Sequence, residues 1–254
     1  MIRTLWVYLV GLVATFFNAG NVVLRSYFWR RNMHKACDNA ARRWGRAMLW
    51  AAGVRVEMEG LENLFTDRPQ IIVSNHQSWF DVFVLAACLP VRYRFVAKQE
   101  LGRIPVFGRS WKACGHVSVD RGNREAAVGA LDQAWREVRE GRLTMILFAE
   151  GTRSLDGRLQ PFKKGAFVLA VQGQVPIVPV AVVGSREIMA KGATRVRPGL
   201  VTVRIGTPIP TEGSTIRDRN RLLQESWDAI FALKGEGAHP EGPPRQVQKT
   251  GGDP

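Results

Sequence analysis

The sequence predicts an α/β fold: a mixed, largely parallel sheet flanked by helices and preceded by N-terminal membrane-associating helices. Short apolar runs alternate with segments of helical periodicity, as strands and helices alternate in α/β chains. Two clusters of reactive side chains directly follow such apolar runs, and α/β folds bind ligands at the carboxyl ends of their strands. A long uncharged apolar run at the N-terminus adds the membrane-associating part.

The composition allows a sizeable core and indicates an anionic partner. The 254 residues are 46% hydrophobic and 23% charged, which is ordinary for a globular protein. The net charge of +14 favours nucleic acid, an acidic membrane or phosphorylated substrates as partners. Composition alone leaves these three classes open.

The cysteines and histidines predict no structural metal. Cys37, Cys88 and Cys114 are an odd number without metal-ligand spacing, and all three lie in apolar surroundings. They are interpreted as packing thiols in a reducing compartment. The four histidines are scattered along the chain.

Residues 1–52 are predicted to form a membrane-associating helical region. No charged residue lies between Arg3 and Arg25, although the apolar core at 5–17 is shorter than the roughly 20 residues of a spanning helix. Residues 28–52 combine arginines and tryptophans at helical spacing, which suits a membrane interface. The alternatives are a signal peptide, or two ordinary helices packed on the domain with a solvated basic face.

Residues 53–234 have the pattern of a globular α/β domain. Strands are predicted at 54–58, 70–74, 93–97, 116–120, 144–148, 175–183 and 201–205. Helices are predicted most clearly at 123–140 and 216–233. Residues 235–254 contain five Gly and four Pro, so we expect a disordered tail.

The first reactive cluster, residues 75–81, follows an apolar strand. His76 precedes Asp81 by five residues, so a turn entering a helix can bring the carboxylate to one imidazole nitrogen. Asp81 would fix the tautomer and leave the other nitrogen to take a proton from a hydroxyl. This spacing also arises by chance in a chain with four histidines, and a lone histidine is more often structural.

The second cluster comprises Glu150, Gly151, Thr152 and Arg153. Gly151 lets the backbone approach a ligand, Thr152 can donate a hydrogen bond, and Arg153 can grip phosphate through two N–H groups. Alternatively, Glu150 and Arg153 pair with each other across a turn. Between the two clusters lies a basic, Gly/Pro-punctuated turn at 97–108, and a proline-bearing apolar strand follows at 175–180.

Together and in this order, the four segments resemble the blocks of the 1-acylglycerol-3-phosphate acyltransferase family, within the wider glycerolipid acyltransferases, over residues 71–183. The resemblance implies a glycerol-3-phosphate acyltransferase-like fold and acyl transfer to the 2-hydroxyl of 1-acylglycerol 3-phosphate, giving phosphatidic acid. It implies that His76 is the general base and Asp81 orients it. The residues that it implies for the acceptor phosphate are Glu150, Gly151, Thr152, Arg153, Lys98 and, less directly, Arg103. One departure is Ala149, where the family usually has proline before the glutamate.

The resemblance also implies the partners. They are a lysophospholipid acceptor, an acyl-carrier protein or coenzyme A thioester as donor co-substrate, and an anionic membrane, with no cofactor, metal or nucleic acid. We expect the protein at the cytoplasmic face of a bacterial inner membrane. Alternatives are another acceptor, such as glycerol 3-phosphate or an amino-acid lysolipid, a thioesterase, or a non-catalytic basic binding module. The G-x-S-x-G motif typical of α/β-hydrolase esterases is absent from the sequence.

Overall fold

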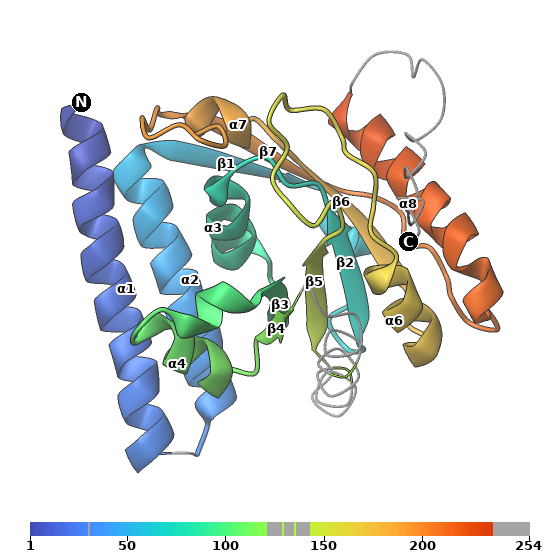
Figure 1. The fold of residues 1–254 in the computed structure, drawn as a ribbon, viewed down its shortest axis with the longest axis horizontal. Helices are drawn as coiled ribbons and strands as arrows, with labels where there is room; N and C mark the ends of the chain where they lie inside the picture. Colours follow the sequence, from blue (N-terminus) through green and yellow to red (C-terminus); the bar gives the residue numbers. More distant parts are fainter. Residues whose placement is uncertain (30, 121–128, 130–134, 136–142, 236–254) are drawn as a thin grey trace, which may run out of the picture.

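The computed structural model describes residues 1–29, 31–120, 129, 135 and 143–235. Its centre is a seven-stranded sheet with helices on both faces, in the strand order β1-β7-β6-β2-β5-β3-β4 (Figure 1). Neighbouring strands run parallel except for the antiparallel pair β6 and β7. This confirms the predicted mixed, largely parallel sheet. The strands are β1 Val54–Glu59, β2 Gln70–Ser74, β3 Tyr93–Lys98, β4 Val117–Val119, β5 Thr144–Phe148, β6 Ile177–Val183 and β7 Gly199–Ile205.

All seven predicted strands are present. The predicted bounds match those of β2 and β5, and the other strands differ from prediction only at their ends. The predicted last helix is a short 3-10 turn, η3 Ile216–Asp218, followed by α8 Arg219–Lys234. The helix predicted at 123–140 and the tail predicted at 235–254 lie almost entirely outside the described residues.

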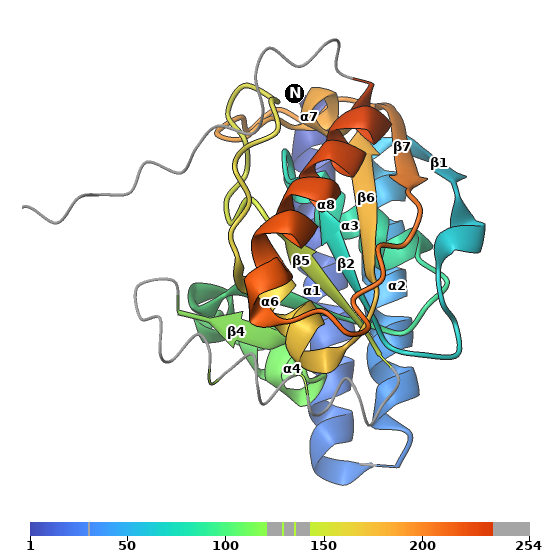
Figure 2. The same ribbon diagram turned by 90° about the vertical axis from the view of Figure 1, so that its right-hand side faces the viewer.

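Alternate residues of the central strands face two separate helical layers, as the two-residue period of a strand requires. Ile72 and Ile146 face the layer that contains α3 Trp79–Cys88, whereas Ile71 and Met145 face the opposite layer. The first layer comprises α1 Ile2–Phe28, α2 Met33–Ala52, α3 and α4 Phe107–Ala113. The opposite face is covered by α6 Gly165–Gly173 and α8 (Figure 2).

The two N-terminal helices, α1 Ile2–Phe28 and α2 Met33–Ala52, belong to the same core as the rest of the chain. Met48 and Leu49 of α2 share a buried cluster with Phe80 and Phe83 of α3. The Trp44 indole also donates a hydrogen bond to the Thr15 hydroxyl at 2.9 Å, which ties α2 to α1. Residue 52 therefore marks a change of sequence pattern and not a break in packing.

One face of α1 leaves a stripe of large apolar side chains exposed. The helix has 27 residues, roughly 40 Å at 1.5 Å per residue, so it is longer than its apolar core predicts and long enough to cross a membrane. The exposed fractions are 68% for Leu5, 71% for Leu12, 66% for Phe16 and 72% for Phe17. A contiguous apolar surface of this kind marks a membrane or protein contact, and it supports membrane association of this helix.

Two of the three cysteines form a disulfide, so the prediction of three packing thiols was wrong. Cys37 of α2 and Cys114 at the end of α4 are bonded, with 5.5 Å between their Cα atoms. Cys88 alone is a free thiol, and burial raises the pKa of this thiol. The bonded pair is separated by 77 residues, and only the packing of α2 beside α4 brings the two together. Sequence spacing does not reveal such a pairing.

Reducing this disulfide is expected to destabilise the protein. A cross-link closing a loop of 77 residues restricts the unfolded chain, with a loop-closure contribution on the order of 4 kcal/mol. We expect a reductant to lower the melting temperature by on the order of 10 °C. The double variant Cys37→Ala/Cys114→Ala should not respond to reductant, whereas the matched control Cys88→Ala should respond like the unaltered protein. Equal melting with and without reductant would contradict the prediction.

Candidate active site

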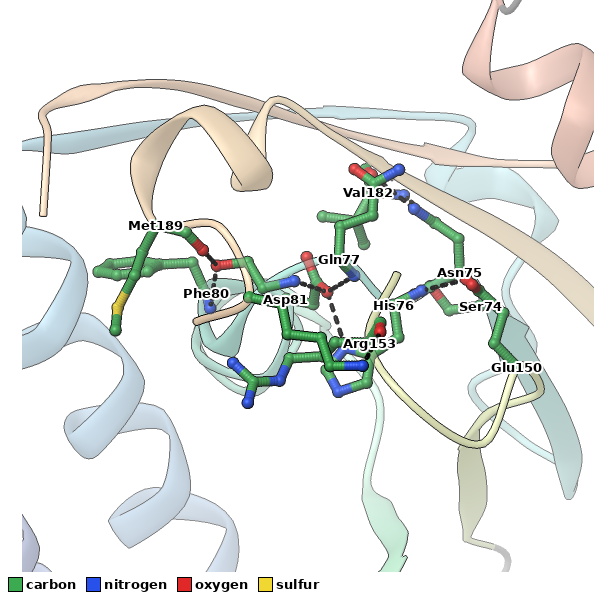
Figure 3. A network of polar contacts seen from close by, with 12 residues as sticks. Ser74, Asn75, His76, Gln77, Phe80, Asp81, Glu150, Arg153, Val182 and Met189 are labelled. Atoms are coloured by element: carbon green, nitrogen blue, oxygen red, sulfur yellow. Dashed lines mark hydrogen bonds and ion pairs between the residues drawn. The ribbon is translucent and has the colours of Figure 1, made fainter. Parts of the chain in front are cut away.

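The two reactive clusters meet because β2 and β5 are neighbours in the sheet. Ser74 at the end of β2 pairs with Phe148 at the end of β5. His76 and Glu150 each lie two residues beyond this pair, where the strands end. The amide of His76 donates a hydrogen bond of 2.6 Å to the Glu150 carboxylate (Figure 3).

His76 and Asp81 form the expected pair. The distance between His76 Nδ1 and Asp81 Oδ2 is 2.8 Å, and the Asp81 side chain is fully buried. The same oxygen accepts hydrogen bonds from the amides of Gln77 at 2.7 Å and Ser78 at 2.9 Å. Asp81 thus engages Nδ1 and leaves Nε2 as the ring nitrogen available as a base.

The first turn of α3 explains why this segment holds Asp81 in place. Ser78 is the N-cap residue, and Ser78 and Asp81 form a reciprocal capping box that satisfies free backbone amides at the helix start. The Ser78 hydroxyl also donates to the carbonyl of Met189 at 2.7 Å. A negative charge is favoured at a helix N-terminus, so the same residue caps α3 and orients His76.

Phe148 fixes the other side of the imidazole. Its ring stacks on the His76 ring with 4.0 Å between centroids and an interplanar angle of 15°. Only 14% of the His76 side chain is exposed, on the side that lines a cavity. The imidazole is therefore held by a hydrogen-bond partner and by a stacked ring, with one nitrogen left for chemistry.

The Glu150 side chain supports the His76 turn and is not among the described residues that line the cavity. Its two oxygens accept hydrogen bonds from the amides of His76 and, at 3.2 Å, Gln160. The residue is 3% exposed, and this burial raises the pKa of its carboxyl to about 8. These two oxygens therefore bond to backbone amides and do not form the alternative ion pair with Arg153.

The buried Glu150 carboxyl should make stability fall with increasing pH. Above its ordinary pKa of 4.5 the unfolded chain releases a proton that the folded protein keeps up to about pH 8. The contribution of Glu150 to the free energy of unfolding is intact below pH 4.5 and is lost as pH rises toward 8. The free energy of unfolding should fall by at most about 1.4 kcal/mol per pH unit over this range. Unfolding curves from pH 5 to 8 should show a flatter dependence for Glu150→Gln. The control Glu57→Gln, at an exposed position of β1, should retain the wild-type slope, and an unchanged slope in Glu150→Gln would contradict the assignment.

The turn after Glu150 presents Thr152 and Arg153 at the cavity. Gly151 has a φ of +72°, a left-handed conformation that glycine adopts without strain. The Arg153 guanidinium lies over the Trp79 ring, 4.9 Å from its centroid. Figure 3 shows Arg153 beside the His76–Asp81 pair. Both Thr152 and Arg153 line the cavity.

The cavity has a volume of about 560 Å³ and lies between the N-terminal helices, α3 and the sheet. Its polar lining includes His76, Lys98 and Arg153, and it extends to the Cys37–Cys114 disulfide. Most of the remaining lining is apolar, with contributions from α1, α2, α3, β3 and α4. These apolar residues include Val22, Ala40, Val82, Phe83, Ala86, Phe95 and Phe107. The arrangement suits a ligand with a polar end and a long apolar part.

Lys98 and Arg103 fall in different places. Lys98, at the end of β3, lines the cavity and forms an ion pair of 2.5 Å with Glu100. Arg103 is exposed at the end of η2 Gln99–Arg103 and is not among the described residues that line the cavity. The structure therefore brings Lys98 toward His76 and leaves Arg103 at the surface.

Some residues that hold the site carry no sequence signal of their role. Asn75 is fully buried, and its side-chain amide makes two hydrogen bonds to the backbone of Val182, at 2.7 and 2.9 Å, which fasten the end of β2 to β6. Ala149 donates its backbone N–H to Ser74 at 3.2 Å, a bond that the family's usual proline cannot make. Lys191 contacts the turn at 152–153 from a distant loop. Within the described part of the chain, no group of three His, Cys, Asp or Glu side chains could hold a metal ion.

Fold and site together define an α/β protein with a histidine–aspartate pair and a basic turn at the ends of two parallel strands. The family profile described as Acyltransferase matches residues 55–183, about half of the chain. The chain belongs to this acyltransferase family.

The relatives include proteins named 1-acyl-sn-glycerol-3-phosphate acyltransferase. The protein of that name from Limnanthes alba is 39% identical over 172 residues, covering 68% of this chain. The alpha form from Homo sapiens is 36% identical over 166 residues, covering 65%. The chain spans about 60% of the length of these relatives. The crystal structure of the 1-acyl-sn-glycerophosphate (LPA) acyltransferase from Thermotoga maritima matches with a TM-score of 0.77 and 29% identity, over 94% of this chain and 97% of that one.

Proposed function

We propose that the protein is a 1-acylglycerol-3-phosphate O-acyltransferase. It transfers a fatty acyl group from a thioester to the 2-hydroxyl of 1-acylglycerol 3-phosphate and forms phosphatidic acid. The observation that carries the proposal is the His76–Asp81 pair at an apolar cavity whose polar lining also contains Arg153. The names of the relatives and the similarity to the Thermotoga maritima structure support the same activity.

The proposed reaction is direct acyl transfer. His76 Nε2 accepts the proton of the acceptor hydroxyl while the hydroxyl oxygen attacks the thioester carbonyl. Asp81 holds Nδ1 and stabilises the imidazolium that forms. When the tetrahedral intermediate collapses, the C–S bond breaks and the imidazolium proton neutralises the departing thiolate. The ring returns to its starting state, and the mechanism needs no cofactor beyond the thioester co-substrate.

The acceptor phosphate is proposed to bind at Thr152 and Arg153, with Lys98 as a further cation. Arg153 suits this role because its guanidinium can form two parallel hydrogen bonds with a phosphate. Thr152 and Lys98 line the same cavity as His76. Gly151 allows the backbone to turn, and the Glu150 side chain accepts hydrogen bonds from backbone amides. These two residues are therefore proposed to shape the backbone of the site.

The apolar cavity is proposed to hold an acyl chain. Its volume of about 560 Å³ lies within the range of roughly 300–1,000 Å³ that is usual for ligand pockets. A chain lying there would place its carboxyl-derived carbon near His76. Holding two amphipathic substrates in line should supply much of the rate enhancement.

The protein is proposed to lie on the membrane surface and not to span it. The face of α1 opposite the exposed stripe packs on the domain along the length of the helix. At one end Arg3 donates to the Ala52 carbonyl at 3.1 Å, and toward the other end Val22 packs beside the disulfide. A spanning α1 would draw α2 and the site into the bilayer. The apolar stripe, together with the net charge of +14, suits an anionic membrane surface.

An assay of the purified full chain tests the proposal. Lysophosphatidic acid and glycerol 3-phosphate are each supplied with an acyl-carrier-protein donor and with acyl-coenzyme A, and the lipid products are identified. We expect phosphatidic acid from lysophosphatidic acid with at least one donor. Acylation of glycerol 3-phosphate alone would indicate the alternative acceptor. Lipid binding without any acyl transfer would indicate a non-catalytic module.

A further inference from the structure

Lys191 lies beside the residues proposed to bind phosphate, although 38 residues separate it from Arg153. Its Nζ donates to the Arg153 carbonyl at 2.8 Å and lies 3.3 Å from the Thr152 hydroxyl oxygen. It follows the short helix α7 Ser185–Ile188, in a loop that no sequence motif connects with the site. The loop reaches the site because β6, which precedes it, lies next to β2.

The same loop contacts both halves of the site. Met189, two residues before Lys191, accepts a hydrogen bond of 2.7 Å from Ser78, the N-cap residue of the helix that carries Asp81. Figure 3 shows Met189 near Phe80, on the α3 side of the network. The loop is therefore anchored at the α3 N-cap by Met189 and at the phosphate turn by Lys191.

The charge of Lys191 is not neutralised by a carboxylate in the described part of the chain. Lys98 forms an ion pair with Glu100, whereas the two acceptors of Lys191 are a carbonyl and a hydroxyl. Two donors of the ammonium group are used by these contacts, and a third is available. A second cation, Arg153, is one residue away from Thr152. Such a concentration of positive charge without an acidic partner favours an anion.

We propose that Lys191 is a further phosphate-binding residue, which completes the acceptor-phosphate site with Thr152 and Arg153. This inference rests on the proposed function, because it takes the phosphate of the lysolipid as the anion. The remaining ammonium donor binds a phosphate oxygen, and the hydrogen bond to the Arg153 carbonyl holds the turn that presents the guanidinium. Lys191 does not take part in proton transfer, so its effect is on acceptor binding.

Binding of two matched lipids to the purified full chain tests Lys191 independently of turnover. The lipids are 1-acylglycerol 3-phosphate and the monoacylglycerol with the same chain, which lacks the phosphate. Lys191→Met should weaken binding of the phosphorylated lipid roughly 10- to 100-fold, the range for a hydrogen bond to a charged group, and leave monoacylglycerol binding unchanged. Lys191→Arg should recover most of the affinity. The control Arg195→Met removes an exposed cation four residues further on and should bind both lipids like the wild type.

Kinetics separate a binding role from a structural one. Lys191→Met should raise the KM for lysophosphatidic acid, while the KM for the thioester donor should remain at the wild-type value. Equal losses of affinity for both lipids, together with a raised KM for the donor, would show that Lys191 only maintains the fold. Unchanged affinity for the phosphorylated lipid would remove Lys191 from the site. If the wild type binds the phosphorylated lipid in a Lys191-dependent way but transfers no acyl group, the proposed function fails and the phosphate site stands.

Discussion

Replacing His76 with alanine is expected to lower the rate of acyl transfer by about 10²- to 10⁴-fold, the usual contribution of a general base. The fold should persist because the His76 amide, and not its ring, bonds to Glu150. Thermal unfolding and lipid binding should therefore remain near wild type, and kcat should carry the loss. The measurement is the initial rate of phosphatidic acid formation at saturating substrates.

Two further variants make the assignment specific. Asp81→Asn should cost less than His76→Ala, because an amide oxygen can still accept from the His76 ring and from the amides of Gln77 and Ser78 although the negative charge is gone. His34→Ala removes an exposed histidine of α2 and serves as the matched control, with no change in rate expected. If His76→Ala kept more than about a tenth of the wild-type kcat, His76 would not be the base.

The double variant Leu12→Asp/Phe16→Asp is expected to release the protein from membranes. The two side chains lie one helical turn apart on α1 and are 71% and 66% exposed. Burying each in lipid should contribute about 1.5–3 kcal/mol, so losing both should weaken vesicle binding by on the order of 100-fold or more. Vesicle flotation measures the binding. Activity on lysophosphatidic acid in bilayers should fall, whereas activity on a soluble short-chain acceptor should remain.

The control variant changes an exposed apolar residue on the other side of the sheet. Ile216→Asp, at a 45% exposed position in η3, should float like the wild type. Flotation of the double variant at the wild-type level would show that α1 is not the anchor. Point changes test this face better than deleting residues 1–52 would, because the deletion would remove buried Met48 and Leu49 from the core.

Arg46 is a better candidate than Arg42 for electrostatic attraction to an anionic membrane. Arg46 is exposed, whereas Arg42 donates to the Val91 carbonyl at 2.9 Å and therefore supports the fold. The periodicity of the basic helix does not separate the two positions, because the direction of each side chain depends on which face α3 covers.

The sequence by itself determined the features that depend on near neighbours. The period-two and apolar runs placed all seven strands, and the five-residue spacing of His76 and Asp81 produced their pairing, because one turn and a capping box join them. The order of the four segments predicted the family. These features arise within a few residues, where backbone geometry leaves few alternatives.

Tertiary structure alone decided which distant residues support that pair. Glu150 is 74 residues from His76, Cys37 is 77 from Cys114 and Lys191 is 38 from Arg153. Each contact depends on which strands are neighbours and which helix lies over them. The neighbours of β2 are β5 and β6, and the turns after all three strands therefore converge on one site. Sequence patterns report the period of an element and not its neighbours. Nothing along the chain therefore signals that the Glu150 carboxyl accepts hydrogen bonds from the backbone amides of His76 and Gln160.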